Sequence, residues 1–167
     1  MTQKVKRSYL EISSIRDLKE GQKPSEDYSL SLLDPINFQL NKFFYKNIGK
    51  KHKWVDRLVW TESKWIDYVS DKKVKTYVLK HKEDLAGFFE LIFHFKKQEV
   101  ELAYFGLLEE YQNKKIGSYL LTEAIKRSFM DNINRVWLHT CSLDHKNALN
   151  NYIARGMKIF KTETVII

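Results

Sequence analysis

A short polar turn between two apolar segments holds the residues of this sequence that are best suited to chemistry. The run 100–105 has the apolar content and partial alternation of a strand, and apolar residues recur at helical spacing from Ile116 onward. Between them lie Lys114, Lys115 and Gly117. A strand that enters a helix through such a turn directs several free backbone N–H groups at one point, and the helix dipole adds to their field. The spacing therefore predicts an anion site for phosphate, the alternative being an ordinary strand–turn–helix with two solvated lysines.

Two segments in the C-terminal part of the chain resemble a known family. Residues 112–117, Gln-Asn-Lys-Lys-Ile-Gly, resemble the Gln/Arg-x-x-Gly-x-Gly/Ala signature of the GCN5-related N-acetyltransferases, the GNAT family. Residues 143–157 resemble the next block of that family, with Ala148 and Tyr152 at matching positions. Lys115 stands where the family usually has its first glycine. A side chain there can obstruct close backbone approach to phosphate, whereas a lysine can add its own charge.

The resemblance implies acetyl-CoA (coenzyme A) as the cofactor. Backbone N–H groups from Asn113 to Ser118 would hold its pyrophosphate, and the main chain of Leu107 and Leu108 would pair with the pantetheine arm as an added strand does. His145 stands where many relatives have an asparagine that contacts the arm, the alternative being a solvated histidine in a first helical turn. The predicted cofactor-binding residues are Leu107, Leu108, Gln112, Asn113, Lys114, Lys115, Ile116, Gly117, Ser118, His145 and Tyr152.

Acetyl transfer to an amine requires a base for the amine, polarisation of the thioester carbonyl and an acid for the departing thiolate. Tyr152 matches the tyrosine that the family uses as this acid, the alternative being a structural tyrosine half in the core. Glu101 matches, by its distance before Gln112, the strand glutamate of the histone-acetylating branch, and is the candidate base. Glu90 is the second candidate and water the third. Alternation would place Glu101 on the same strand face as Phe105.

Two further side chains on the run 134–141 could do chemistry. We interpret His139 as a satisfied buried histidine, and Cys141 as a small core thiol because no activating base is evident near it. Cys141 is the only cysteine, which excludes an internal disulfide and favours a cytoplasmic protein. The sequence indicates no metal site.

The N-terminal elements can be read from caps and periodicity. We expect a strand at 7–12, then a helix entered at Asp34-Pro35 with Asp34 as its cap and Gly49 at its end. A second helix should begin after Thr61 and run to about residue 69.

Three strand-like runs follow at 74–80, 85–95 and 99–107, and their short connections favour an antiparallel meander. The strand 134–141 is reached by a helical crossover, so it should lie parallel to 99–107. Asp144 should cap the following helix, and Gly156 should close it.

Two terminal strands at 157–160 and 163–167 complete the expected order of elements. This order is that of the GNAT fold. It implies one α/β (α+β) domain over 1–167, with a mixed central sheet of about seven strands, splayed at a bulge and flanked by about four helices. Glycine suits a bulge, so we expect the bulge near Gly106 and Leu107.

The segment 54–65 contains three tryptophans mixed with charged residues. These aromatic side chains could form the wall of a pocket with polar groups, or they could anchor a connection onto the core. The sequence does not decide between the two.

Composition limits the range of partners. Lysine and arginine exceed aspartate and glutamate by 29 − 21 = 8, which favours an anionic partner such as a polyphosphate cofactor. The run 50–53, Lys-Lys-His-Lys, is the densest basic cluster, but we consider nucleic acid the less favoured partner. No apolar run is long enough to cross a membrane, and the first residues lack the apolar core of a signal peptide.

The sequence thus predicts an acetyl-CoA-dependent N-acetyltransferase that acts on a primary amine by direct attack in a ternary complex. The acceptor, a small-molecule amine or a peptide, cannot be read from residues outside the two family blocks. A non-catalytic acyl-CoA-binding or regulatory domain and a basic nucleic-acid-binding domain are the alternatives. The oligomeric state is not visible in the sequence, so a homodimer stays open.

Overall fold

The computed structural model describes residues 2–130 and 132–167, and a seven-stranded mixed sheet runs through them in the order β2-β3-β4-β5-β6-β1-β7. The strands are β1 (Lys4–Ile12), β2 (Tyr28–Leu32), β3 (Val74–His81), β4 (Asp84–His94), β5 (Glu99–Leu107), β6 (Arg135–Cys141) and β7 (Lys158–Ile166). The α-helices are α1 (Phe38–Gly49), α2 (Glu62–Ser70), α3 (Ile116–Ser128) and α4 (Ala148–Ala154).

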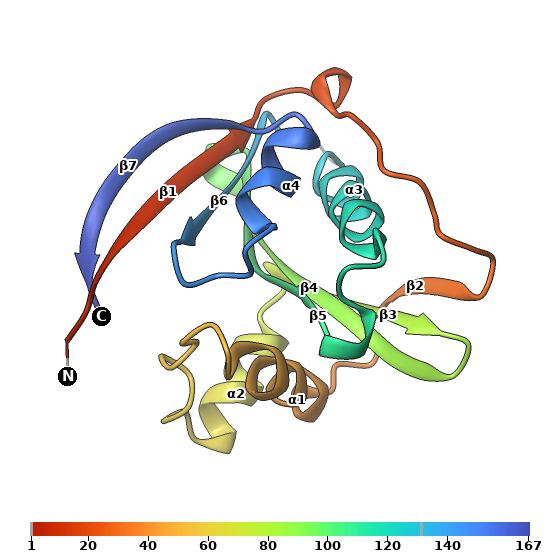
Figure 1. The fold of residues 1–167 in the computed structure, drawn as a ribbon. Coiled ribbons are helices and arrows are strands. Elements are labelled where there is room, and N and C mark those ends of the chain that lie inside the picture. The colour runs from red at the N-terminus through yellow and green to blue at the C-terminus, as the bar shows by residue number, and fades with distance from the viewer. Residues whose placement is uncertain (1, 131) are drawn as a thin grey trace.

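The helices cover the two faces of the sheet in pairs. Figure 1 shows α3 and α4 on one face, α1 and α2 on the other, and β1 and β7 as a curved ribbon that extends beyond the helices. The larger apolar core lies under α3, where Leu120 and Ile125 are fully buried. The smaller core lies under α1, where the rings of Phe44 and Phe88 stack with their centroids 4.9 Å apart. The sheet is therefore buried on both faces at its centre.

The predicted connections within the sheet are confirmed. Strands β3, β4 and β5 form an antiparallel meander, and β6 lies parallel to β5 after the crossover through α3. β1 pairs with both β6 and β7, so the start of the chain is enclosed by the end of the chain.

The predicted number of strands is correct, but two assignments differ from the structure. The strand β2 was not predicted, and it pairs with β3 from Tyr77 to His81. The two predicted terminal strands are one continuous strand, β7, because Lys161 and Thr162 pair with Tyr9 and Ser8 where a break was expected. A register shift next to that point leaves Phe160 as an extra residue, which interrupts the alternation.

Of the predicted N-caps, only that of α2 agrees with the structure, whereas α1 ends at Gly49 as predicted. Thr61 accepts a hydrogen bond from the backbone N–H of Lys64 at 3.2 Å. At α1, the predicted cap Asp34 is wrong, because the helix begins later and Asn37 is its N-cap. At α4, the predicted cap Asp144 is wrong, since the first helical residue is Ala148.

Asp144 instead closes the turn that follows β6. Its carboxylate accepts hydrogen bonds from the hydroxyl of Thr140 and from the backbone N–H of Cys141. Beyond α4, Gly156 has a φ of +106°, and a Cβ there would lie 2.2 Å from the carbonyl oxygen of Asp17. Glycine is therefore required at the exit from this helix, as predicted.

Candidate active site

The parallel strands β5 and β6 separate after a short contact. In the described part of the chain they pair only from Glu99 to Glu101 on β5, opposite Arg135 to Trp137 on β6. Beyond that point both strands continue without pairing to each other. The predicted splay of the sheet is therefore confirmed.

The bulge lies earlier than predicted. Glu90 on β4 faces Tyr104, but Leu91 faces Leu102, so Ala103 is the extra residue on β5. The register is regular through Gly106, and the prediction of a bulge there is wrong. The glycine suggested a bulge, but Gly106 meets a different requirement: a Cβ on it would lie 2.7 Å from the side chain of Ile48 on α1.

The bulge also reverses the strand face on which Glu101 was predicted. Before the bulge, Leu102 faces the core under α3, and after it Phe105 and Leu107 face that core. Glu101 lies opposite Ile92 on β4. Ile92 and Glu90 are two residues apart on that strand, so their side chains point to the same face. Glu101 therefore shares a face with Glu90, toward α1 and α2, rather than with Phe105.

A cavity of about 930 Å³ occupies the space that the splay opens. It is lined from three sides: by the connection between α1 and α2, by the two separated strands, and by the starts of α3 and α4. The predicted site residues that line it are Glu101, Leu107, Gln112, Asn113, Lys115, Gly117, Ser118, His145 and Tyr152. The cavity is large enough for a cofactor arm together with an acceptor.

The turn before α3 has the geometry of an anion site. Asn113 and Lys115 adopt left-handed backbone conformations, with φ of 61° and 62°, and α3 begins at the next residue, Ile116. Among the described residues, no backbone N–H from Asn113 to Gly117 donates to an acceptor outside the helix. These donors are therefore free for an anion at the helix start.

The left-handed conformation of Lys115 gives a physical reason for the family's glycine at this position. Only glycine adopts this region of φ without strain, yet the chain holds a lysine there and its side chain is exposed. The turn is fixed from both ends. Gln112 Nε2 donates to the carbonyl oxygen of Leu107 at 3.1 Å, and Asn151 Nδ2 donates to that of Gly117 at 3.1 Å.

Three predicted cofactor residues do not line the cavity. The N–H of Leu108 donates to the carbonyl oxygen of Ala86 at 2.9 Å, so it pairs with β4 and not with the gap. The side chain of Ile116 is fully buried in the core, which leaves only its backbone for an anion. Lys114 is exposed, and its Nζ lies 5.8 Å from the ring centroid of Tyr111.

Tyr152 lies in the cavity wall in a setting that keeps its hydroxyl protonated. The residue is buried, and its ring packs edge-on against Phe105 at 6.2 Å between centroids. Burial raises the pKa of Tyr152, and the negative charge of Asp144 raises it further. A neutral phenol can donate a proton or a hydrogen bond throughout the physiological range.

The two candidate bases have different surroundings. Glu101 is partly exposed to the cavity, and its Oε1 lies 3.3 Å from His94 Nε2. Glu90 is fully buried and does not line the cavity. It accepts hydrogen bonds from Asn41 at 2.9 Å, Arg57 at 2.9 Å and Tyr68 at 2.6 Å. Glu90 is therefore a structural partner of Arg57 rather than a base within reach of the cavity.

The tryptophan-rich segment divides between the two interpretations. Trp54, Asp56 and Arg57 line the cavity, whereas Trp65 is 1% exposed and anchors α2 in the core. Trp60 packs against Trp65, and its ring lies 4.7 Å from the Arg57 guanidinium. The start of the segment is thus a pocket wall, and its end is an anchor.

Arg57 is the centre of a buried cluster beside the cavity. Its guanidinium lies 4.3 Å from the ring centroid of Tyr68 and 4.2 Å from that of Tyr104. Burial acts to lower the pKa of Arg57, but Glu90, Tyr68 and Tyr104 together outweigh it and the pKa is raised, so Arg57 stays charged. We refer to Arg57, Glu90, Tyr68 and Tyr104 as the arginine cluster.

His139 and Cys141 both line the cavity, on the side formed by β6. Loss of hydration within the cavity lowers the pKa of His139. The charge of Arg7 lowers it further, so the imidazole is neutral at pH 7. Burial raises the pKa of the Cys141 thiol, which agrees with an unactivated thiol. The interpretation of His139 as a buried core residue is wrong, because its side chain is exposed in the cavity.

Part of the basic run 50–53 lines the cavity. Lys51 forms an ion pair with Glu109, His52 Nδ1 lies 3.1 Å from the carbonyl oxygen of Leu143, and Lys53 lines the cavity. His52 and His145 face each other with ring centroids 6.2 Å apart. Burial lowers the pKa of His145, as do the charges of His52 and Lys146.

Two of the cavity residues that the sequence did not single out make contacts that matter for the site. Arg7 on β1 lines the cavity and lowers the pKa of His139, and Asn151 on α4 holds the start of α3. Neither position carries a sequence signal, because each becomes significant only through a contact with a distant segment.

The sequence and the fold agree on a family. Residues 37–157 match the family model of the Acetyltransferase (GNAT) family, which is most of the chain. The chain therefore belongs to the GNAT acetyltransferase family, whose members use acetyl-CoA. No curated protein matches the sequence.

Solved structures share the fold at low sequence identity. A GCN5-related N-acetyltransferase from Sphaerobacter thermophilus is 13% identical with a TM-score of 0.72, over 97% of this chain and 50% of that one. A functionally unknown conserved protein from Staphylococcus epidermidis is 18% identical with a TM-score of 0.64, over 99% of this chain and 62% of that one. The chain thus spans less than two thirds of the length of these two structures.

The spermidine N-acetyltransferase of Vibrio cholerae is 16% identical with a TM-score of 0.65, over 86% of this chain and 96% of that one. At such identities the likeness concerns the fold alone.

No helix in the described residues is long and apolar enough to cross a membrane.

Proposed function

We propose that the protein transfers the acetyl group of acetyl-CoA to a primary amine that enters the cavity beside Trp54. One observation carries the proposal: a single cavity is lined by the turn of free backbone donors, by Glu101 and by Tyr152, whose raised pKa keeps it protonated. An anion site, an acid and a candidate base thereby line one cavity.

The free N–H groups of the turn would bind the pyrophosphate, and Lys115 would add its charge. The unpaired edge of β5 would receive the pantetheine arm, with Leu107 in its wall. The N–H of Leu108 is already paired with β4, so Leu108 is no longer part of the proposed contact set.

The amine nitrogen would attack the thioester carbonyl carbon, forming a C–N bond while the C–S bond breaks. Glu101, directly or through water, would accept the proton that the amine loses. Tyr152 would donate its phenolic proton to the departing sulfur, and solvent would then restore it. The raised pKa of Tyr152 supports this role, because an ionised tyrosine could not donate.

The acceptor class follows less directly. The Vibrio cholerae relative is named for spermidine, a polycation. The excess of eight positive charges in this chain favours a neutral or anionic amine instead, because like charges repel at the entrance.

A thiol-release assay with acetyl-CoA and a panel of amines tests the proposal. We expect turnover above background with at least one neutral or carboxylate-bearing primary amine. Tight binding of coenzyme A without turnover on any amine would identify a non-catalytic acyl-CoA-binding domain instead. Absence of both binding and turnover would contradict the cofactor site itself.

A further inference from the structure

The imidazole of His139 differs from those of the other four histidines of the chain. In each of the others, a ring nitrogen lies within 3.4 Å of a hydrogen-bond partner; they are His52, His81, His94 and His145. Within the described residues, no such partner is found for His139, which is exposed and lines the large cavity. Its ring nitrogens are therefore available to a ligand.

His139 points to the same side of the sheet as Glu101. Val136 and Leu138 of β6 belong to the larger core under α3, so Trp137 and His139, which alternate with them, point to the opposite side. Trp137 is the register partner of Glu101, and paired residues of neighbouring strands share a face. Glu101 and His139 therefore both face the part of the cavity on the side of α1 and α2.

The gap between β5 and β6 begins between these two groups. The pairing of the strands ends at Glu101 and Trp137, and His139 follows two residues later, roughly 7 Å farther along β6. The charge of Glu101 acts on the imidazole of His139, so the two groups are near each other. Tyr152 packs against Phe105 in the core on the side of α3. Two hydrogen-bond acceptors and the proposed acid thus line the gap from opposite faces of the sheet.

The surroundings of His139 keep its imidazole neutral. Loss of hydration and the charge of Arg7 on β1 lower its pKa. The carboxylates that act in the opposite direction do not reverse this shift; they are Glu101, Asp144 and Asp56. The ring of Tyr9 lies 5.5 Å from the imidazole between centroids. A neutral imidazole has one ring nitrogen that accepts a hydrogen bond, whereas an imidazolium ion has none.

We propose that His139 and Glu101 together hold the two N–H groups of an uncharged primary amine, and that His139 thereby selects primary over secondary amines. This inference rests on the proposed acetyl transfer. Glu101 accepts a hydrogen bond from one N–H group and His139 from the other, which leaves the lone pair of the nitrogen free to attack the thioester carbonyl in the gap. The proton still passes to Glu101 or to water, so His139 binds the amine and does not act as the base.

The number of N–H groups explains the selection. A secondary amine has a single N–H group, and Glu101 requires it because this is the proton that the nitrogen loses. His139 is then left without a donor in a cavity from which the bound amine displaces water. A site that offers two acceptors therefore disfavours an analogue that has only one donor.

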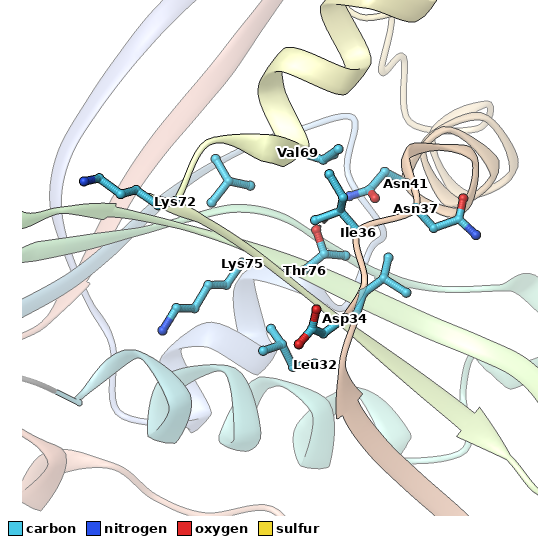
Figure 2. Close-up of a pocket in the computed structure, with 11 residues that line it drawn as sticks. Leu32, Asp34, Ile36, Asn37, Asn41, Val69, Lys72, Lys75 and Thr76 are labelled. Carbon is cyan, nitrogen blue, oxygen red and sulfur yellow. Dashed lines mark hydrogen bonds between the residues drawn. The ribbon is translucent and has the colours of Figure 1, made fainter.

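A smaller hollow on the same side of the sheet provides a comparison. It has a volume of about 220 Å³ and shares no lining residue with the large cavity. Figure 2 shows its single carboxylate, Asp34, together with Lys72 and Lys75. None of its lining residues is a histidine, so it has no counterpart of the pair formed by His139 and Glu101.

Steady-state kinetics of the full chain with acetyl-CoA test the proposal. The two probes are the most active primary amine of the thiol-release panel and its N-methyl derivative. His139→Leu should raise the KM for the primary amine by about tenfold through loss of one hydrogen bond, with the KM for acetyl-CoA unchanged. His139→Gln keeps an acceptor oxygen and should stay within about threefold of the unchanged protein.

The choice between the two amines gives a second result from the same variants. The unchanged protein should prefer the primary amine in kcat/KM. His139→Leu should reduce this preference by about tenfold, because the secondary amine makes no contact with His139 that it could lose.

The pH dependence separates this role from a structural one. Since the pKa of His139 is lowered, the imidazole becomes protonated only below about pH 6.5 and then no longer accepts an N–H group. The ratio of the amine KM in His139→Leu to that in the unchanged protein should therefore fall toward one as the pH falls below this value. A ratio that is constant with pH would overturn the proposal.

Two control variants should keep both the amine KM and the preference for the primary amine. His81→Leu removes a histidine that does not line the large cavity, and Asp34→Asn changes the smaller hollow. An unchanged amine KM in His139→Leu, or equal losses in His139→Leu and His139→Gln, would overturn the inference while acetyl transfer stands. Absence of turnover by the unchanged protein with every amine would overturn the proposed function, and this inference with it.

Discussion

The two ends of the large cavity are built in different ways. At the proposed cofactor end, consecutive residues from Asn113 to Gly117 offer free main-chain donors, and the site follows from the local path of the chain. At the proposed acceptor end, Arg57 from one connection is held by Glu90 of β4 and by aromatic rings of α2 and β5. One end depends on backbone conformation, and the other depends on side chains that meet from four separate segments.

This difference explains why the family is readable from the sequence and the acceptor is not. A main-chain site tolerates many side chains, so it accommodates a common cofactor in sequences that share few residues. A side-chain site changes with each substitution and carries the specificity of one protein. The predictions below separate the two ends, because each variant should affect stability, turnover or backbone strain at one end only.

Removal of Glu90 should have the largest effect. Glu90→Ala leaves the buried charge of Arg57 without its partner, which should lower the free energy of unfolding by about 3–5 kcal/mol. Urea denaturation followed by circular dichroism measures this. Glu109→Ala is the control, since it breaks an ion pair with Lys51 that lies at the surface and should change stability little. Equal effects of the two variants would mean that the arginine cluster does not support the acceptor end.

Tyr152→Phe should lower turnover by about a hundredfold through loss of the acid. The affinity for coenzyme A, measured by calorimetry, should stay nearly the same. Tyr119→Phe is a matched control, because Tyr119 is equally buried, at 8% exposure, and does not line the cavity. Normal turnover by Tyr152→Phe, or a large loss of affinity in its place, would remove the acid role.

Glu101→Gln should lower turnover by about tenfold or more and shift the acidic limb of the pH–rate profile if Glu101 accepts the proton of the amine. The control is Glu99→Gln, two residues earlier on β5, where the carboxylate pairs with Arg135 outside the cavity. An unaltered profile for Glu101→Gln would assign the proton transfer to water.

Lys115→Gly should stabilise the fold by about 0.5–1 kcal/mol, because it relieves a left-handed conformation that glycine adopts without strain. Lys114→Gly should have the opposite sign, since Lys114 has no positive φ and gains only chain entropy in the unfolded state. Thermal unfolding of both variants measures the difference. Two variants of equal stability would show that the turn is not strained at Lys115.

The smallest expected effect is a dependence of stability on pH from His139. Loss of hydration within the cavity and the charge of Arg7 lower its pKa in the folded protein, so the unfolded chain takes up a proton first as the pH falls. The free energy of unfolding should therefore decrease as the pH falls through about 6.5, the ordinary value of histidine. His139→Gln should reduce this decrease in pH-dependent urea denaturation, and an identical pH dependence would contradict the assignment.

Much of the fold was predictable because the deciding signals are local. The meander, the parallel crossover and the Thr61 cap each follow from patterns within a few residues. The missed strand β2 also had a signal, the alternation of Tyr28, Leu30 and Leu32, but its flanking polar loop concealed it.

The remaining differences arise from contacts between distant segments. The bulge at Ala103 depends on how β5 pairs with β4, and it moves Glu101 to the opposite face of the strand. Asp144 does not cap α4, because its carboxylate accepts hydrogen bonds from Thr140 and from the backbone of the turn after β6. The role of Glu90 depends on Arg57, which is 33 residues away in the sequence. Periodicity and local caps carry no information about such pairs.

A calorimetric titration of the protein with coenzyme A tests the central claim most directly. A diphosphate held by the free main-chain donors before α3, with the thiol arm between β5 and β6, requires saturable binding of one coenzyme A per chain. Saturation with the backbone amides from Asn113 to Ser118 shifted in a parallel magnetic resonance spectrum is the predicted result. An isotherm without saturable heat, together with unshifted amides in that turn, would contradict the account.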